Sequence, residues 1–322
     1  MDSIAARLAA VVPIALLLAA SSCSSVDGGR VDAPRWAIAV HGGAGTMNPD
    51  GAKERLRAYE DAMAAALALG TGMLRDGAAA LDVCEAVVRS LEDNPLFNAG
   101  KGAVFNENGV HELDASIMDG ATMRCGAVAG IRTVKHPVTL ARKVMADTRH
   151  VLLAGDGAEK FAAVAGVDRV KNTYFDTPER RRALQRLLRQ RERTGAAAPA
   201  DRRFDYGTVG CVVLDHAGDL AAATSTGGMT AKKWGRVGDT PILGAGNYAD
   251  GYAAISCTGT GEEFIRHGVA RSVTARMQYG GQTLAQAAGA VVHDVLASGD
   301  GGLIAVDRDG NIATPFNTTG MY

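Results

Sequence analysis

The stretch "YGTVGCVVLD", residues 206–215, decides how the rest of the chain is interpreted. Its apolar and β-branched part, Val209 to Leu214, has the composition of a buried strand. The strand is entered through Gly207 and Thr208, directly behind a segment that is polar, basic and rich in alanine. A core strand that begins with a hydroxyl residue behind a glycine, at the end of a linker, calls for a functional explanation.

The composition is that of a folded protein with a large core. The chain has 322 residues, a formal net charge of −1 and 47% hydrophobic residues, which allows one or two domains. A net charge this close to zero gives no support for a nucleic acid or a membrane surface as partner. The 40 glycines accompany long apolar segments, so they indicate tight turns and close backbone approaches instead of disorder.

The first 23 residues have the pattern of an export signal. Arg7 precedes an apolar run, Leu8 to Ala20, that is too short to span a bilayer comfortably, and "SSCSS" follows. Because Cys23 comes after small residues, it is similar to the lipid-attachment cysteine of bacterial lipoproteins; the alternative is an ordinary cleaved signal. We therefore expect an exported protein, periplasmic or lipid-anchored to the bacterial cell envelope, with a polar lead over residues 24–35.

The remaining cysteines carry no metal-binding or disulfide signature. None belongs to a C-x-x-C pair, and two lie inside apolar strand-like runs. Export would permit disulfides, but spacing alone pairs none of them. We predict buried, small hydrophobic side chains at Cys84, Cys125, Cys211 and Cys257.

Strands and helices alternate along the chain in groups. The expected strands are 36–40, short strands within 94–120, 125–131, 208–214, 219–224, 253–257, 302–307 and 311–316. The expected helices are 52–75, 78–93, a stretch over 137–165 broken at Gly155 and Gly157, 261–278 and 283–297. Hairpin-like turns at Asp215–Gly218 and Asp309–Gly310 favour largely antiparallel sheets with helices stacked outside, an α+β fold.

A basic segment separates the two halves of this pattern. Residues 178–203 hold nine arginines against three acidic residues, and "TGAAAPADRR" ends the run. One interpretation is an anionic partner; the other, which we favour, is a solvated helix that ends in a flexible linker, with the whole segment at about 178–206.

Hydroxyl and glycine residues gather after two strand-like runs, in "TSTGGMT" (224–230) and "SCTGTG" (256–261). Glycines behind a strand leave backbone N–H groups accessible, and a threonine hydroxyl adds a donor, which suits a site for a developing oxyanion. Between them lie Arg236 and Asp239, whose opposite charges would bind the α-carboxylate and α-ammonium of an amino acid. The alternative is a surface salt bridge.

Two further residues are candidates for the chemistry. His41, before "GGAG", is either a functional residue or a structural histidine at a strand end, and we favour the second. The Thr208 hydroxyl is a poor nucleophile unless a base adjoins it, and one solution is to make threonine the first residue of a chain, so that its own α-amine is the base. That requires cleavage of the Gly207–Thr208 bond.

Eight ordered motifs over about residues 36–322 resemble the plant-type L-asparaginase/isoaspartyl peptidase family of self-cleaving N-terminal nucleophile hydrolases. They are "HGGAG", "NPLFNAGKGAVFN", "HELDASIMDG", "GTVGCVVLD", "TSTGGMT", "GRVGDTPILGAGNYA", "SCTGTGE" and "PFNTTGMY". The resemblance implies hydrolysis of L-asparagine and isoaspartyl (β-aspartyl) dipeptides with release of L-aspartate. A related activity, glycosylasparaginase, is an alternative. We expect Asp-Thr at the cleavage point of that enzyme, whereas this chain has Gly-Thr at residues 207–208. An inactive exported amino-acid-binding lipoprotein is another.

The resemblance also implies a role for each matching residue. Thr208 would be the nucleophile in autoproteolysis at Gly207–Thr208 and in amide hydrolysis, with Thr226 in support. Arg236 would bind the substrate carboxylate and Asp239 its ammonium group. The oxyanion hole would be Thr258 and Gly259, with Gly261 near the substrate pocket.

The family further implies a four-layer αββα sandwich and a dimer of αβ heterodimers. Residues 36–207 would form the α subunit and residues 208–322 the β subunit, together one folded domain. No cofactor is expected for catalysis. A structural sodium ion would be held by main-chain carbonyls in the loop 91–101, those of Leu91, Glu92, Asn94, Phe97, Ala99 and Lys101.

Overall fold

The computed structural model describes residues 36–45, 53–194 and 207–322. The predicted export signal with Cys23, the polar lead and the linker after residue 194 lie outside the described residues. Within the described ranges, no helix is both long enough and apolar enough to cross a membrane.

The larger sheet has six strands and contains the strand that opened the sequence analysis. Its order is β1-β5-β6-β2-β3-β4, and every neighbouring pair is antiparallel except β3 with β4. The strands are β1 (Ala37–His41), β5 (Val209–Leu214), β6 (Leu220–Thr226), β2 (Leu113–Asp119), β3 (Cys125–Ile131) and β4 (Leu152–Ala154). β5 is therefore hydrogen-bonded along both edges, to β1 and to β6.

A second, antiparallel sheet of four strands packs against the first. Its order is β10-β9-β8-β7, formed by Ile312–Ala313, Gly301–Asp307, Ala253–Gly259 and Asn247–Ala249. One buried apolar cluster draws side chains from both sheets, among them Val212 of β5 and Ile304 of β9. The facing sides of the two sheets thus form a common core.

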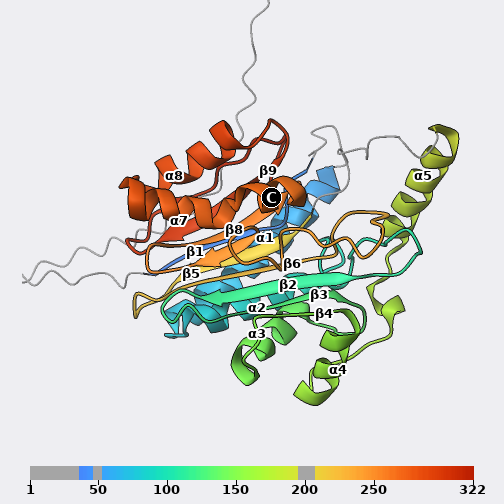
Figure 1. The fold of residues 1–322 in the computed structure, drawn as a ribbon, viewed down its shortest axis with the longest axis horizontal. Helices are drawn as coiled ribbons and strands as arrows, with labels where there is room; N and C mark the ends of the chain where they lie inside the picture. Colours follow the sequence, from blue (N-terminus) through green and yellow to red (C-terminus); the bar gives the residue numbers. More distant parts are fainter. Residues whose placement is uncertain (1–35, 46–52, 195–206) are drawn as a thin grey trace, which may run out of the picture. The chain divides into compact units, whose positions relative to one another are not determined.

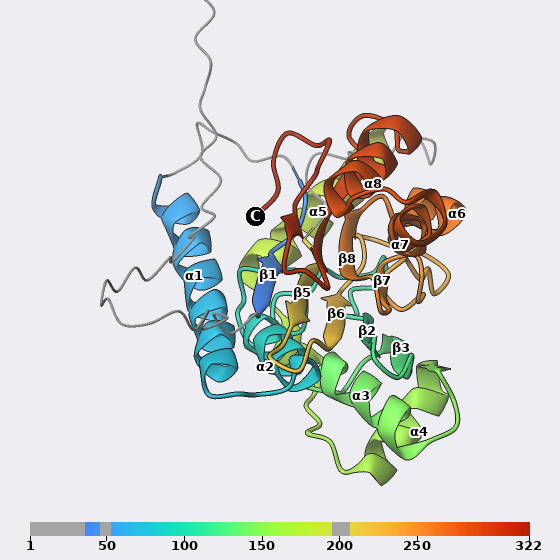
Figure 2. The same ribbon diagram turned by 90° about the vertical axis from the view of Figure 1, so that its left-hand side faces the viewer.

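Helices cover the outer side of each sheet (Figures 1 and 2). On the six-stranded sheet these are α1 (Lys53–Arg75), α2 (Ala80–Glu92), α3 (Pro137–Asp147) and α4 (Gly155–Ala165). On the other they are α6 (Gly261–His267), α7 (Val269–Gly280), α8 (Leu284–Ala290) and the π-helical turn η2 (Val291–Val295). The spacing of apolar residues in α2 explains why it packs on the sheet: Val83, Val87 and Leu91 recur at helical spacing and all are buried. The fold is a mixed α and β architecture.

Several predicted boundaries were wrong. Gly155 begins α4 and Gly157 lies inside it, so the break in 137–165 is the segment 148–154 with β4. The helix expected over 261–278 is divided at Gly268, whose φ of 53° ends α6 in the left-handed conformation. The strand predicted over 219–224 extends to Thr226 in the structure, as β6. Of the strand predicted over 311–316, only the two residues of β10 are observed as a strand.

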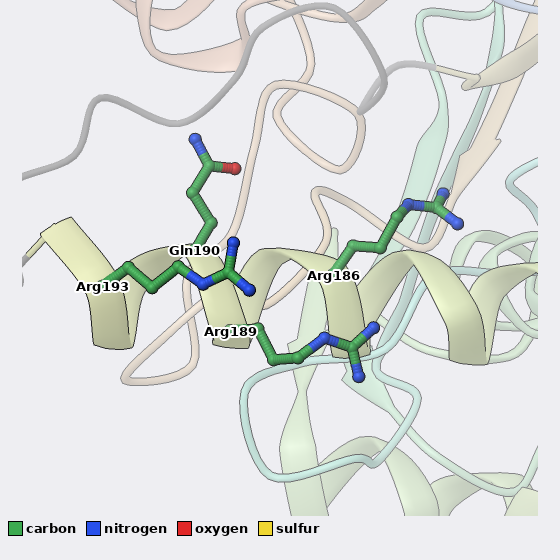
Figure 3. A pocket seen from close by; sticks show the side chains of 4 residues that line it. All are labelled: Arg186, Arg189, Gln190 and Arg193. Atoms are coloured by element: carbon green, nitrogen blue, oxygen red, sulfur yellow. The ribbon is translucent and has the colours of Figure 1, made fainter.

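The basic run forms helix α5 (Pro178–Thr194), after the 3-10 turn η1 (Asn172–Phe175). Its leucines, including Leu184, pack against Phe105 and Ala231. Arg186, Arg189, Gln190 and Arg193 project from the exposed side of the helix and line a pocket (Figure 3). This is the arrangement of a helix with one solvated face, the interpretation favoured from the sequence. The four cysteines within the described residues are free thiols. Cys84, Cys211 and Cys257 are buried as predicted, whereas Cys125, at the start of β3, is only half-buried.

Glu92, the last residue of α2, is a buried acid inside this core. Its Oε1 accepts hydrogen bonds from the Ser225 hydroxyl at 2.6 Å and from the Val138 N–H at 3.0 Å. Burial raises the pKa of Glu92 to about 8, against the opposing effect of these two donors. The folded protein therefore holds Glu92 protonated at neutral pH, where an unfolded chain would have released the proton.

This difference predicts a pH dependence of stability. A raised carboxyl pKa contributes stability that is fully present below about pH 4.5 and is lost as pH rises towards 8. Between pH 5 and 8, the free energy of unfolding of the wild type should fall by on the order of a few kcal/mol more than that of Glu92→Gln. Urea unfolding at both pH values measures this, with the exposed Glu60→Gln as control. Parallel profiles for wild type and Glu92→Gln would contradict it.

Candidate active site

The start of β5 is the place where two glycine turns of the large sheet meet. β1 pairs with β5 so that His41 lies opposite Gly210, and β6 pairs with it so that Ser225 lies opposite Val209. Because both neighbours run antiparallel to β5, each ends where β5 begins. The turns "HGGAG" and "TSTGG" therefore flank Thr208, although they are far apart in the sequence.

The Thr208 hydroxyl is held by the end of β6. Its Oγ1 donates a hydrogen bond to Oγ1 of Thr226 over 3.0 Å, and the Gly228 N–H donates to the same oxygen over 3.1 Å. Thr226 is buried and is paired across the sheet with Asp114. The two threonines that the sequence singled out are thus brought into direct contact, and the acceptor is fixed on a rigid strand.

The peptide bond between Gly207 and Thr208 is packed on both sides. The Asn98 N–H donates to the Gly207 carbonyl oxygen over 3.2 Å. On the other side lies Gly43, with φ of 116°, where a Cβ would stand only 2.4 Å from the Gly207 Cα. Glycine is required at position 43 for this close approach and this backbone conformation.

Asn98 is a site residue that the sequence analysis missed. Its amide Nδ2 donates to the Gly228 carbonyl at 2.7 Å, and its Oδ1 accepts from the Val104 N–H at 2.9 Å. Its own carbonyl accepts from the Gly227 N–H at 3.0 Å. Asn98 lies in an Asn-Ala-Gly sequence that was interpreted only as a turn, and its contacts with residues about 130 positions away have no local signal.

Arg236 has a carboxylate partner that was not predicted. Its Nε and Nη2 donate to the two oxygens of Glu262, each over 2.9 Å, in a bidentate pair. Burial lowers the pKa of Arg236, but the hydrogen bonds and charge of Glu262 outweigh it, so the pKa is raised. The guanidinium is therefore oriented and charged, with Glu262 half-exposed on its outer side.

Asp239 is not part of a surface salt bridge, so that alternative was wrong. The residue is buried, and its Oδ2 has no hydrogen-bond partner in the part of the chain that the structure describes. Burial raises the pKa of Asp239 to about 7, against the charge of Arg236. A Cβ at position 261 would stand 2.9 Å from both Arg236 Nη2 and Asp239 Oδ1, so Gly261 leaves the space between the two charges open.

Thr258 and Gly259 lie at the end of β8, on the facing sheet. The buried Thr258 hydroxyl accepts a hydrogen bond from the Ala44 N–H over 3.1 Å. Ala44 follows Gly43, which packs against Gly207, so Thr258 adjoins the same glycine turn. Gly259 is paired with Gly301, and a Cβ there would stand 2.1 Å from the Asp300 carbonyl oxygen.

Together these residues define the kind of site found in hydrolases: a strand-end hydroxyl, backbone donors beside it, and a pair of opposite charges. The chain belongs to the asparaginase family, whose model matches residues 34–322. It is 49% identical over 295 residues to an isoaspartyl peptidase of Escherichia coli, covering 88% of this chain and 91% of that protein. It is 41% identical to a plant-type L-asparaginase of Pyrococcus abyssi (88% and 94% covered) and to a human isoaspartyl peptidase/L-asparaginase (88% and 91%).

The space kept open by Gly261 gives a direct test of the charge pair. In Gly261→Ala, the new Cβ would crowd both Arg236 and Asp239, so the dissociation constant for L-aspartate should rise by about tenfold or more, ~1.4 kcal/mol. L-Aspartate is the probe because it offers both carboxylate and ammonium groups, and calorimetry measures its binding. Gly289→Ala is the matched control, since a Cβ there meets nothing within 4 Å. Equal binding by both variants would contradict the assignment.

Proposed function

We propose that this protein is a self-cleaving threonine hydrolase that releases L-aspartate from L-asparagine and from isoaspartyl dipeptides. The observation that carries the proposal is the 3.0 Å hydrogen bond from Thr208 Oγ1 to Thr226 Oγ1, directly behind Gly207 at the start of a core strand. The names of the relatives support the same substrates. The enzyme acts on small molecules or peptides.

Autoproteolysis would begin with attack of the Thr208 hydroxyl on the Gly207 carbonyl carbon. The Asn98 N–H, which already contacts that carbonyl oxygen, would stabilise the negative charge that develops on it. The Gly207–Thr208 C–N bond then breaks as the amine takes up the hydroxyl proton, leaving an ester. Water hydrolyses the ester to a Gly207 carboxylate and frees Thr208 as an amino terminus.

Substrate hydrolysis would use the new α-amine as the base for its own hydroxyl. Thr208 Oγ1 attacks the side-chain carbonyl of the substrate, and ammonia or an amino acid leaves with the transferred proton. Water then hydrolyses the β-aspartyl ester. Thr226 orients the attacking oxygen, and Thr258 with Gly259 would hold the oxyanion.

The charge pair would select an α-amino acid. Arg236, oriented by Glu262, would bind the substrate α-carboxylate, and Asp239 would bind the α-ammonium, across the gap left at Gly261. The unpartnered Oδ2 of the buried Asp239 supports this, because a buried carboxyl oxygen without a partner is unfavourable until a donor arrives. Small, doubly charged substrates fit such a site better than an apolar ligand does.

The finer architecture follows from the same proposal. The two facing sheets with helices outside correspond to a four-layer αββα sandwich of the N-terminal nucleophile type, with a dimer of αβ heterodimers as the mature unit. The proposal also includes export of the protein and lipid attachment at Cys23. Both depend on residues that precede the family match, which begins at residue 34.

A structural sodium ion would be held in the loop after α2. A Cβ at Gly102 would stand 2.4 Å from the Pro95 carbonyl oxygen and 2.7 Å from that of Phe97, so carbonyls converge in this loop. Sodium would be bound by the carbonyls of Leu91, Glu92, Asn94, Phe97, Ala99 and Lys101. The carbonyls of Leu91, Glu92 and Asn94 also accept backbone hydrogen bonds, so an ion would share these oxygens with N–H groups. The ion would fix the loop that carries Asn98 and take no part in the chemistry.

The proposed function predicts that the Gly207–Thr208 bond is cleaved. Purified protein should give two bands on denaturing electrophoresis, and sequencing of the smaller fragment should begin at Thr208. Thr208→Ala removes the attacking hydroxyl and should stay uncut, whereas Thr208→Ser keeps a hydroxyl and should still cleave.

The wild type should also release ammonia from L-asparagine and L-leucine from β-Asp-Leu. A single uncut wild-type band without ammonia release would refute the hydrolase. Faster release from glycosylated asparagine would favour a glycosylasparaginase, and aspartate binding without turnover would favour an amino-acid-binding protein.

The proposed function also predicts that ligand binding depends on pH. The free site holds Asp239 with a pKa of about 7, so below that pH the carboxyl is neutral and cannot pair with an ammonium. Binding of L-aspartate should weaken by up to about tenfold per pH unit as pH falls from 7 to 5. Succinate, which lacks the ammonium group, and Asp239→Asn with L-aspartate serve as controls and should lose this dependence. An identical profile for both ligands would argue against the role of Asp239.

A further inference from the structure

Residues 227–236 follow β6 and end at Arg236 without forming a helix or strand, and we call them the substrate arm. One end of the arm lies at the candidate nucleophile, because the Gly228 N–H donates to Thr226 Oγ1 over 3.1 Å. The other end carries Arg236, whose N–H donates to the Lys233 carbonyl over 2.9 Å. The conformation of the arm therefore sets where the Arg236 guanidinium stands relative to Thr226.

Two residues of the substrate arm hold a backbone conformation that is unfavourable for their type. Ala231 has a φ of 53° and Trp234 a φ of 55°, both in the left-handed region that residues other than glycine seldom adopt. A residue keeps such a conformation only where the surrounding structure imposes it, and such residues cluster at functional sites. The arm is therefore held in shape by its neighbours.

Ala231 is fixed through its N–H, its carbonyl and its methyl group by the part of the chain before the Gly207–Thr208 bond. Its N–H donates to the Phe105 carbonyl over 2.8 Å, and its carbonyl accepts from Arg191 Nη1 of α5 over 3.2 Å. Its methyl group lies in a buried cluster with Phe105 and Leu184. Two of these three neighbours, Leu184 and Arg191, belong to α5.

The same face of α5 also holds the loop that carries Asn98. Arg180 Nε donates over 2.8 Å to the carbonyl of Gly102, four residues after Asn98. Arg180, Leu184 and Arg191 follow one another at spacings of four and seven residues, which places them on one side of a helix. α5 thus joins the Asn98 loop to the substrate arm.

Glu107 and Glu112 hold the next two residues of the arm. The Glu107 N–H donates to the Lys232 carbonyl over 3.1 Å, and Lys232 Nζ donates to the Glu112 carbonyl over 2.8 Å. Lys233 Nζ lies 3.5 Å from the Glu107 carboxylate. These contacts do not involve α5, so the arm would keep part of its support if α5 lost its hold on Ala231.

We propose that α5 holds the substrate arm in its binding conformation and that Arg191 is a positioning residue for Arg236, acting through the Ala231 carbonyl. The proposal rests on the proposed function, in which Arg236 binds the α-carboxylate of the substrate. The arginines drawn in Figure 3 lie on the exposed side of α5, whereas Arg191 contacts the arm. The part of the chain before the cut thereby contributes to substrate binding without touching the substrate.

Arg191→Met tests this role, because methionine keeps a long side chain with good helix propensity and removes the donor to Ala231. Loss of one hydrogen bond should raise KM for L-asparagine by about threefold to tenfold. The value of kcat should stay unchanged, because the hydrogen bond from Thr208 to Thr226 does not involve α5. Both constants are measured per mole of free Thr208 terminus.

The matched control is Arg189→Met, on the exposed side of the same helix, which should leave KM unchanged. A second test is recovery. Glycine adopts a positive φ readily, so Ala231→Gly makes the arm less dependent on Arg191. The double variant Arg191→Met/Ala231→Gly should recover most of the lost affinity, whereas a residue that only stabilises the fold would show no such recovery.

The outcomes distinguish this inference from the proposed function. A wild type that is uncut or releases no aspartate refutes the proposed function, and the inference with it. A wild type that is cut and active, beside an Arg191→Met enzyme with unchanged KM, refutes the inference alone. An equal rise of KM in Arg189→Met, a loss that falls on kcat, or no recovery in the double variant would reduce Arg191 to a structural residue.

Discussion

The pairing of β5 on both edges is the constraint on which the site depends. The register sets Val209 opposite Ser225 and Gly210 opposite His41, so one step further along β5 Thr208 comes opposite Thr226 on one side and the glycine turn on the other. A slip of one residue would turn every side chain of the strand to the opposite face. β5 is buried on both faces, against α2 on one side and the second sheet on the other. A slip would therefore place a side chain where Gly210 lies, and a Cβ there would stand only 1.9 Å from Ser256 Oγ, so the core fixes the position of the hydroxyl to within one residue.

Burial also sets the charge state of the site. Glu92, His41 and Asp239 are all buried, and burial disfavours the charged form of each. Arg236 keeps its charge, because Glu262 pairs with it in a bidentate geometry. A ligand with an ammonium group would restore the charge of Asp239, whereas a ligand without one would leave a buried carboxyl unpaired. In the proposed function, this difference makes the site selective for zwitterions.

The sequence predicted the elements better than their contacts. The β-branched run of β5 and the apolar spacing in α2 are local signals, and both elements were predicted at nearly their observed bounds. The helix boundary at Gly268 was missed because a left-handed glycine leaves no trace in hydrophobic periodicity. Asn98 and Glu262 were missed for a different reason. Their partners, Gly228 and Arg236, are 130 and 26 residues away, and only the folded sheets bring them together.

The interleaved strand order explains how a chain cut at Gly207–Thr208 would remain one body. β1 and β2 precede the bond and β5 and β6 follow it, yet the sheet order is β1-β5-β6-β2. The two parts are therefore joined along two complete ladders, β1 with β5 and β6 with β2, and also by the hydrogen bonds of Asn98 to Gly228 and of Glu92 to Ser225. None of these contacts uses the Gly207–Thr208 bond. Cleavage would change the chemistry of the Thr208 nitrogen while the frame around it, assembled earlier from both parts, stays in place.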